Sequence, residues 1–351
     1  MRSWTNNIRK VEPYVPGEQP KEKDVIKLNT NENPYPPAPG VKKALNGDIA
    51  NNLRLYPDPA ITDLVRAIAE YQDLDENQVF VGVGSDDVLA MAYLAFFNSN
   101  KPILFPDITY SFYDVWANLF KNSFIQPELD ENFRIRKKDY CRENGGIIIA
   151  NPNAPTSIYE DLDTIRYILD NNQESIVIID EAYIDFGGTS AKGLIKDYEN
   201  LLVVQTFSKS RSLAGMRIGY AMGSQTLIKA LNDVKYSFNS YTLNYPSIIC
   251  GVESVKDDAY FSKVVSKIIQ TREKTMKELT KLGFTFPRSS SNFIFAQHEK
   301  ISGKMIFDEL KKRKIYVRHF NQPKIDNYIR ITIGTDEQMR TLIEELEEII
   351  S

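Results

Sequence analysis

The chain has 351 residues, 42% of them hydrophobic, and since single hydrophobic cores stop growing near about 250–300 residues, we expect two domains. Its 43 basic and 47 acidic residues give a net charge of −4, which argues against the strongly basic surface of a protein that binds nucleic acid or an anionic membrane. Two cysteines and two histidines are too few for a disulfide framework or a metal cluster, and without a signal peptide or a membrane-length apolar run we expect a cytoplasmic protein.

The N-terminal segment, residues 1–35, is predicted to form an extended arm. Pro13, Pro16 and Pro20 interrupt any regular structure there, and the run from Asn29 to Pro37 contains three further prolines.

Residues 36–240 are predicted to form a mostly parallel, doubly wound α/β domain. Short β-rich runs alternate there with stretches of helical spacing at residues 86–97, 110–120 and 161–169. Buried parallel strands read as nearly continuous apolar runs, and ligands of such domains bind beyond the carboxyl ends of the strands. The β-rich runs are residues 79–83, 102–105, 146–150, 175–180, 201–206 and 218–222.

Residues 241–351 are predicted to form a smaller α+β domain, because the pattern changes after about residue 240. A long helical stretch at 259–282 is followed by β-rich runs and by a last helix from Asp336. Those β-rich runs are residues 292–296, 315–318 and 328–333.

The first polar cluster at a strand end is Gly84-Ser85-Asp86. It is not a dinucleotide-binding fingerprint, because Asp87 occupies the third glycine position of GxGxxG. Free backbone N–H groups at the start of the next helix would suit a single phosphate monoester. A plain Ser or Asp N-cap explains the motif equally well.

The second cluster, Asp180-Glu181, ends an apolar strand. This ending also suits the magnesium-binding strand of a P-loop NTPase, but Gly303-Lys304 is followed by Met305 and lacks the remaining P-loop residues. A carboxylate at the mouth of a buried strand needs a cation to stay ionised, and the protonated ring nitrogen of a cofactor would serve.

The third cluster contains Lys209, three residues beyond the end of its strand. A partly desolvated lysine among other cations forms imines and transfers protons readily, although most lysines are simply solvated surface residues. Taken together, the phosphate cradle, Asp180, Tyr183 and Lys209 are the parts needed to hold pyridoxal 5'-phosphate (PLP).

With these parts in place, nearly the whole chain resembles the fold-type I, PLP-dependent aminotransferases, and among them the class II subgroup that acts on histidinol phosphate. The resemblance implies a large PLP-binding domain at 36–240, a small domain at 241–351, and an arm at 1–35 that joins the small domain and a dimer contact. The motifs that carry it are Asn29-Thr-Asn-Glu-Asn-Pro-Tyr35, Tyr56-Pro-Asp58, Gly84-Ser-Asp86, Asn151-Pro-Asn-Ala-Pro-Thr156, Asp180-Glu-Ala-Tyr183, Ser208-Lys-Ser210, Ala214-Gly-Met-Arg217 and Tyr328-Ile-Arg-Ile-Thr-Ile-Gly334.

The resemblance also implies which residues hold the cofactor. Lys209 would form the Schiff base and transfer the proton, Asp180 would pair with the pyridine nitrogen, and Tyr183 would bind the ring oxygen. The remaining cofactor residues would be Gly84, Ser85, Asp86, Thr206, Ser208 and Arg217 around the phosphate, Tyr110 against the ring, and Tyr56 from the neighbouring subunit.

Two positions depart from the family pattern. Ala154 stands where the family has the asparagine that contacts the ring oxygen, so either Asn153 takes that contact or Tyr183 acts alone. Val83 stands where an asparagine is frequent. The residues implied to bind the substrate are Tyr14, Asn31, Arg318 and Arg330.

The implied reaction is transamination of L-histidinol phosphate with 2-oxoglutarate, giving imidazole acetol phosphate and L-glutamate in histidine biosynthesis. The implied assembly is a homodimer. An aromatic amino-acid aminotransferase, a PLP-dependent decarboxylase of a phosphorylated amino acid, and a silent PLP-binding regulator are the alternatives.

Overall fold

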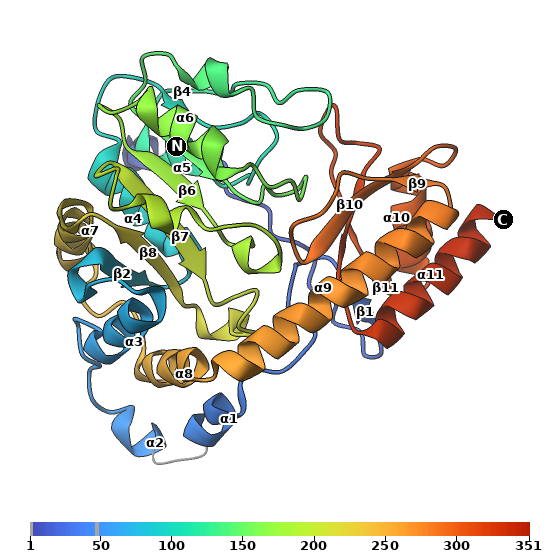
Figure 1. Ribbon diagram of the computed structural model, residues 1–351, viewed down its shortest axis with the longest axis horizontal. Coiled ribbons are helices and arrows are strands. Elements are labelled where there is room, and N and C mark those ends of the chain that lie inside the picture. Colours follow the sequence, from blue (N-terminus) through green and yellow to red (C-terminus); the bar gives the residue numbers. More distant parts are fainter. Residues whose placement is uncertain (1–2, 46–48) are drawn as a thin grey trace.

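A computed structural model describes residues 3–45 and 49–351, which form two lobes connected by the long helix α9 (Asp258–Lys281) (Figure 1). The larger lobe contains a seven-stranded sheet in the order β2-β8-β7-β6-β5-β3-β4. Its strands are β2 (Val79–Gly82), β3 (Ile103–Leu104), β4 (Phe124–Ile125), β5 (Gly146–Ala150), β6 (Val177–Asp180), β7 (Leu201–Thr206) and β8 (Gly219–Gly223).

The seven-stranded sheet is parallel from β7 to β4, whereas β8 runs antiparallel to both β2 and β7. The mostly parallel, doubly wound architecture is thus confirmed, and each predicted β-rich run of the large domain contains a strand. The strand β4 is not predicted, because Phe124-Ile125 is an isolated pair of apolar residues between Ser123 and Gln126, too short a run to indicate a strand.

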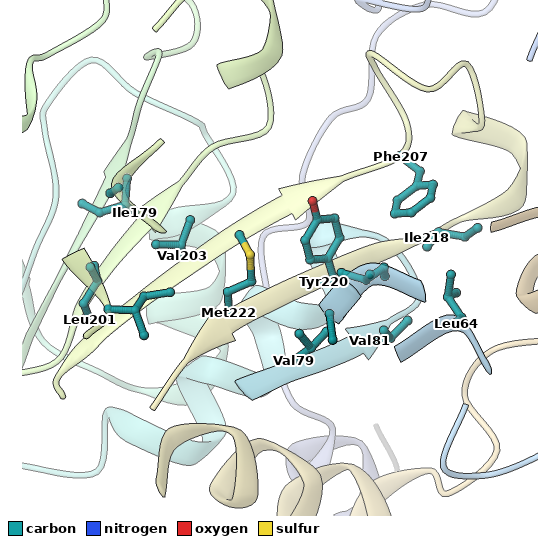
Figure 2. Close-up of a cluster of buried hydrophobic side chains, with 14 of the residues drawn as sticks. Leu64, Val79, Val81, Ile179, Leu201, Val203, Phe207, Ile218, Tyr220 and Met222 are labelled. Carbon is teal, nitrogen blue, oxygen red and sulfur yellow. The ribbon is translucent and has the colours of Figure 1, made fainter. Parts of the chain in front are cut away.

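Alternate residues of the central strands belong to two hydrophobic cores, one on each face of the sheet. Ile179 and Val203 lie in one core, and their neighbours Ile178 and Val204 lie in the other. Because both faces are buried, these strands read as continuous apolar runs. Figure 2 shows part of the first core, where side chains of β2, β6, β7 and β8 extend along the sheet from Ile179 and Leu201 at one end to Leu64 at the other.

Helices cover both faces of the sheet. The first core includes residues of α1 (Pro39–Leu45), α3 (Thr62–Gln72), α6 (Leu162–Asp170) and α8 (Tyr245–Lys256). The second includes residues of α4 (Ser85–Phe96), α5 (Tyr113–Phe120) and α7 (Gln225–Phe238). Helices α6, α7 and α8 each begin where Asp161, Ser224 or Asn244 accepts a hydrogen bond from a backbone N–H three residues on. The short helix α2 (Ile49–Asn52) buries no residue.

The smaller lobe packs α9, α10 (Gly303–Lys312) and α11 (Asp336–Ile350) into a third core with an antiparallel sheet. The order of that sheet is β12-β13-β10-β9. Its strands are β9 (Phe284–Thr285), β10 (Phe293–His298), β12 (Arg318–His319) and β13 (Ile329–Thr332), and a separate parallel pair is formed by β1 (Ile26–Lys27) and β11 (Ile315–Tyr316).

Among the described residues that precede α1, the regular elements are one 3-10 turn (Ser3–Asn7) and β1. Helix α8 follows the predicted domain boundary at residue 240 and packs against α1 and α3 of the larger lobe. The division into residues 1–35, 36–240 and 241–351 stays a prediction. None of the helices in the described part of the chain is long and apolar enough to cross a membrane.

Candidate active site

A cavity of about 400 Å³ opens where the carboxyl ends of β5, β6 and β7 face the arm and the smaller lobe. The topology explains its place, because parallel strands bring their carboxyl ends to the same edge of a sheet. The predicted site residues that line it are Tyr14, Asn31, Ser85, Asp86, Tyr110, Asp180, Tyr183, Thr206, Ser208, Lys209, Arg217, Arg318 and Arg330.

Three predicted site residues do not line this cavity. The side chain of Asn153 is buried and bonded to Thr109, Ile108 and Thr156, and Asn153 does not line the cavity, whereas Ala154 does. Tyr56 is 82% exposed and packs on Tyr241, outside the cavity. Gly84 lies just behind the lining residue Ser85.

Asp180 is the last residue of β6, and its side chain is almost fully buried. Oδ2 accepts a hydrogen bond of 2.8 Å from the hydroxyl of Tyr113, and Oδ1 accepts one of 3.2 Å from the backbone of Ala182. Burial raises the pKa of Asp180 to about 6, against the lowering effect of these two donors. A cation entering the cavity would therefore find a desolvated carboxylate.

Glu181 lies on the other side of the strand end and takes no part in the cavity. Its carboxylate accepts hydrogen bonds from Ser190, Gln205 and the backbone of Ala191, at 2.6, 2.8 and 2.6 Å. Burial raises the pKa of Glu181 to about 7. The neighbouring acids thus have different surroundings, and only Asp180 faces the site.

Lys209 reaches the cavity from the loop that follows β7. Its Nζ donates to the backbone oxygen of Thr30 at 3.2 Å and lies 5.8 Å from the ring centroid of Tyr183. Nδ2 of Asn33 donates to the carbonyl oxygens of both Lys209 and Ser210, at 3.1 Å each. The arm therefore holds the lysine loop from outside the larger lobe.

Tyr183 is bonded to the arm as well. Its hydroxyl accepts a hydrogen bond of 2.8 Å from Nδ2 of Asn31, whose Oδ1 accepts from Thr332 at 3.1 Å. The ring of Tyr183 lies edge-on to Phe293. Because Asn31 donates to this phenol, the phenolic proton is free to be donated to a group in the cavity.

The predicted phosphate cradle lies at the start of α4, whose first turn has no side-chain cap among the described residues. Gly84 precedes it with a φ of 85°, and a Cβ there would collide with the guanidinium of Arg217. Arg217 also forms an ion pair of 3.3 Å with Asp86. Backbone N–H groups and an arginine thus meet at one end of the cavity, which suits an anion.

Two hydroxyls complete this end of the cavity. Oγ1 of Thr206 donates to Oγ of Ser208 at 3.0 Å, and Arg217 approaches the same serine oxygen at 3.5 Å. The hydroxyl of Tyr110 donates to Asp86 at 2.9 Å, while its ring lines the cavity.

Arg318 and Arg330 line the cavity from the smaller lobe, on the paired strands β12 and β13. Arg330 donates to the backbone oxygen of Asn29 at 3.0 Å, and its Nε has no hydrogen-bond partner in the described part of the chain. Burial lowers the pKa of the Arg330 guanidinium, and nearby Arg318 lowers it further. The part of the cavity that Arg318 and Arg330 line therefore suits an anion too.

Arg211, also in the lysine loop, has a structural role. It is buried, its guanidinium lies 4.7 Å from the ring of Tyr71 and 4.2 Å from that of Phe261, and it donates to the oxygen of Ser254 at 2.8 Å. Arg211 therefore packs against aromatic rings and does not line the cavity.

Sequence reasoning missed three contributors to the site: Tyr113, Thr30 and Asn33. No motif in the sequence indicates Tyr113, because it is simply the first residue of a helix, and its hydrogen bond to Asp180 depends on the tertiary fold. Thr30 acts through its backbone oxygen, which any residue would supply. Asn33 belongs to the quoted motif Asn29–Tyr35, so a polar run without regular structure was an available signal.

The residues present fit PLP on structural grounds. The cavity combines a lysine amine, a desolvated carboxylate with no salt bridge to a described residue, and an uncapped helix start beside Arg217. An aldehyde, a protonated pyridine nitrogen and a phosphate monoester are the groups that these three features would bind.

Comparisons with known proteins agree with this chemistry. The family model "Aminotransferase class I and II" matches residues 23–346. A histidinol-phosphate aminotransferase of Clostridium acetobutylicum is 52% identical over 348 residues, covering 99% of both chains. One of Brachyspira hyodysenteriae is 52% identical over 352 residues, covering 100% of this chain and 99% of the relative.

The fold also resembles a solved structure. The crystal structure of histidinol-phosphate aminotransferase from Sinorhizobium meliloti in complex with pyridoxal-5'-phosphate superposes with a TM-score of 0.86 at 21% identity. The match covers 93% of this chain and 90% of that one. At this identity the likeness concerns the fold alone.

Proposed function

This chain belongs to the class I and II aminotransferase family, and from that premise we propose that it is a PLP-dependent enzyme of histidine biosynthesis that transaminates L-histidinol phosphate. The amino acceptor is 2-oxoglutarate, and the products are imidazole acetol phosphate and L-glutamate. Relatives that share about half of its residues over the whole chain carry this activity in their names.

The observation that carries the substrate proposal is the pair Arg318 and Arg330, which line the cavity from the smaller lobe. Two guanidinium groups can grip a phosphate ester by charge-assisted, forked hydrogen bonds. The same pair would hold a carboxylate of 2-oxoglutarate in the other half-reaction. Tyr14, which stacks on Phe112 with ring centroids 4.2 Å apart, also lines the cavity.

PLP supplies the electron sink that accepts the electrons left when the Cα–H bond of the substrate breaks. We assign its phosphate to Ser85, Asp86, Ser208 and Arg217, with Gly84 and Thr206 shaping the cradle. We assign its ring nitrogen to Asp180, whose desolvated carboxylate gains most from a cation. Tyr183 and Tyr110 are assigned to the ring oxygen and the ring face.

Lys209 is assigned both the covalent attachment of the cofactor and the movement of the substrate proton. Its Nζ can take the proton from Cα because it lies inside the cavity on a loop fixed by Asn33. When it is not attached, its amine has a resting place on the backbone oxygen of Thr30. Asn153 is not needed for this scheme, because its side chain is already bonded elsewhere.

We also propose a homodimer in which Tyr56 reaches the neighbouring cavity. Tyr56 is 82% exposed and packs on Tyr241, which is exposed as well, and exposed apolar side chains that cluster on a surface often mark a protein–protein interface. Other large apolar side chains that are exposed in these two segments are Leu53, Leu55 and Phe238. A cytoplasmic location is part of the same proposal, and the free thiols of Cys141 and Cys250 suit a reducing compartment.

The test compares kcat/KM of the PLP-loaded protein for L-histidinol phosphate, phenylalanine, tyrosine and threonine phosphate, with 2-oxoglutarate as acceptor. We expect histidinol phosphate to give the highest value and Lys209→Ala to abolish turnover with each substrate. A preference for phenylalanine would indicate an aromatic amino-acid aminotransferase. Release of CO2 from threonine phosphate without formation of glutamate would indicate a decarboxylase.

A further inference from the structure

Tyr113 is a fully buried tyrosine whose hydroxyl reaches the carboxylate assigned to the cofactor. It is the first residue of α5, and its hydroxyl donates to Oδ2 of Asp180 at 2.8 Å. Oδ1 of the same carboxylate is bonded to the backbone of Ala182. One donor on each oxygen fixes the plane of the carboxylate and leaves its other lone pairs for the cavity that Asp180 lines.

The position of Tyr113 is set by its surroundings rather than by this bond alone. The hydroxyl of Tyr93 donates to its backbone oxygen at 2.8 Å. Its ring lies edge-on to Phe105 and to Tyr110, with centroid distances of 5.9 and 5.7 Å. The packing of the core therefore fixes the position of the Tyr113 hydroxyl beside Asp180.

The phenol of Tyr113 can only donate to Asp180. Burial and the adjacent carboxylate of Asp180 raise the pKa of Tyr113 well above its ordinary value, so the hydroxyl keeps its proton at any working pH. Its hydrogen bond in turn lowers the pKa of Asp180, opposing the effect of burial. Tyr113 thus stabilises the ionised form of this acid.

We propose that Tyr113 is a positioning residue that keeps Asp180 ionised and aimed at the ring nitrogen of PLP, so that the shared proton stays on the nitrogen. A donor on a carboxylate makes that carboxylate a weaker base, which favours the proton on its partner. The inference rests on the proposed role of Asp180, because Tyr113 acts only through it.

The test uses the holoenzyme loaded with PLP carrying nitrogen-15 in the ring, whose chemical shift reports ring protonation. In Tyr113→Phe we expect the signal to move toward that of unprotonated pyridine. We expect kcat to fall about tenfold or more, as for loss of a hydrogen bond to a charged group, with KM nearly unchanged. Tyr140→Phe is the matched control, since Tyr140 is equally buried but its hydroxyl has no hydrogen-bond partner in the described residues.

The variant Asp180→Asn distinguishes a failure of the role proposed for Tyr113 from a failure of the role proposed for Asp180. If Asp180→Asn moves the nitrogen-15 signal and Tyr113→Phe does not, Tyr113 is only a packing residue and the inference is wrong. If neither variant moves it, the assignment of Asp180 to the ring nitrogen fails first.

A second variant covers the case in which Tyr113→Phe does not fold. Replacement of Tyr113 by 3-fluorotyrosine keeps the shape and strengthens the donor. We expect the ring nitrogen of that protein to be at least as protonated as in wild type, and a shift toward the unprotonated value would overturn the inference.

Discussion

Arg318 and Arg330 lie directly opposite each other on the antiparallel strands β12 and β13, although both side chains are positively charged. Like charges in directly opposed positions of a sheet are destabilising. The unloaded protein therefore maintains a repulsive pair at the cavity, and an anionic substrate relieves the repulsion.

Replacing Arg318 by Met should separate stability from substrate binding. We expect the free energy of unfolding without substrate to stay the same or to rise by about 0.2–1 kcal/mol, because the repulsion disappears. KM for histidinol phosphate should rise by about tenfold to a hundredfold, as expected for the loss of charge-assisted hydrogen bonds. Denaturant unfolding and steady-state kinetics measure the two effects. Arg340→Met, which removes an exposed arginine of α11, should change neither, and an unchanged KM in Arg318→Met would contradict the substrate assignment.

The stability of the apoprotein should depend on pH through Asp180. Burial raises the pKa of Asp180 from 3.8 to about 6, so the folded form binds this proton more tightly than the unfolded chain. The resulting stability is present below about pH 4 and is lost as the pH rises to about 6. Asp180→Asn lacks this carboxylate and should not show this loss. From about pH 4 to about pH 6, the free energy of unfolding of the variant should therefore rise relative to that of wild type. Above about pH 6, the difference between the two should stay constant. As a control, replacing the exposed Asp197 by Asn should leave the pH dependence of the free energy of unfolding the same as in wild type. If Asp180→Asn also has the same pH dependence as wild type, the carboxylate of Asp180 titrates normally and the prediction is wrong.

Two arginines of one loop should respond differently to the same substitution. Arg217→Met should weaken PLP binding by about tenfold to a hundredfold, because it removes a cationic donor from the phosphate cradle. Arg211→Met should leave PLP affinity intact and lower the free energy of unfolding by about 1–2 kcal/mol, because its contacts are the rings of Tyr71 and Phe261 and a backbone oxygen. Fluorescence titration with PLP and denaturant unfolding distinguish the two. Equal losses of PLP affinity would mean that Arg211 acts in the site after all.

Mixed dimers should test the proposed reach of Tyr56. Lys209→Ala should be inactive alone, and Tyr56→Ala should be poorly active alone. If Tyr56 acts in the neighbouring cavity, a mixed dimer contains one doubly defective site and one intact site, so an equal mixture should regain about a quarter of wild-type activity. Activity is measured after the subunits have been allowed to exchange. No recovery despite proven exchange would place Tyr56 in its own subunit's site or outside catalysis.

Much of the larger lobe could be predicted from the sequence because strands buried on both faces leave continuous apolar runs. Asp180 and Lys209 stand at or just beyond the ends of such runs, and the parallel topology then brings them to one cavity. The short strand β4 and the direct pairing of Arg318 with Arg330 depend on tertiary contacts, which local sequence patterns do not indicate.

The residues that orient the site were harder to predict than the residues that line it. The hydroxyl of Tyr113 reaches Asp180 from another element, and Thr30 contributes only a backbone oxygen. Arg211 has the same charge as Arg217 and lies nearby in sequence, yet its aromatic neighbours come from α3 and α9. Residue type alone does not distinguish a ligand-binding cation from a packed one.

The N-terminal arm is bonded to strands near the C-terminus of the chain, and these contacts determine when the site can form during synthesis. Ile26 pairs with Ile315, the carbonyl of Asn29 accepts from Arg330, and Asn31 is bonded to Thr332. A ribosome that has made the larger lobe has not yet made these partners, so the resting place of Lys209 on Thr30 cannot be fixed until nearly the last helix is translated. Contacts of such long sequence separation form slowly, and the cavity should be among the last parts of the molecule to mature during synthesis.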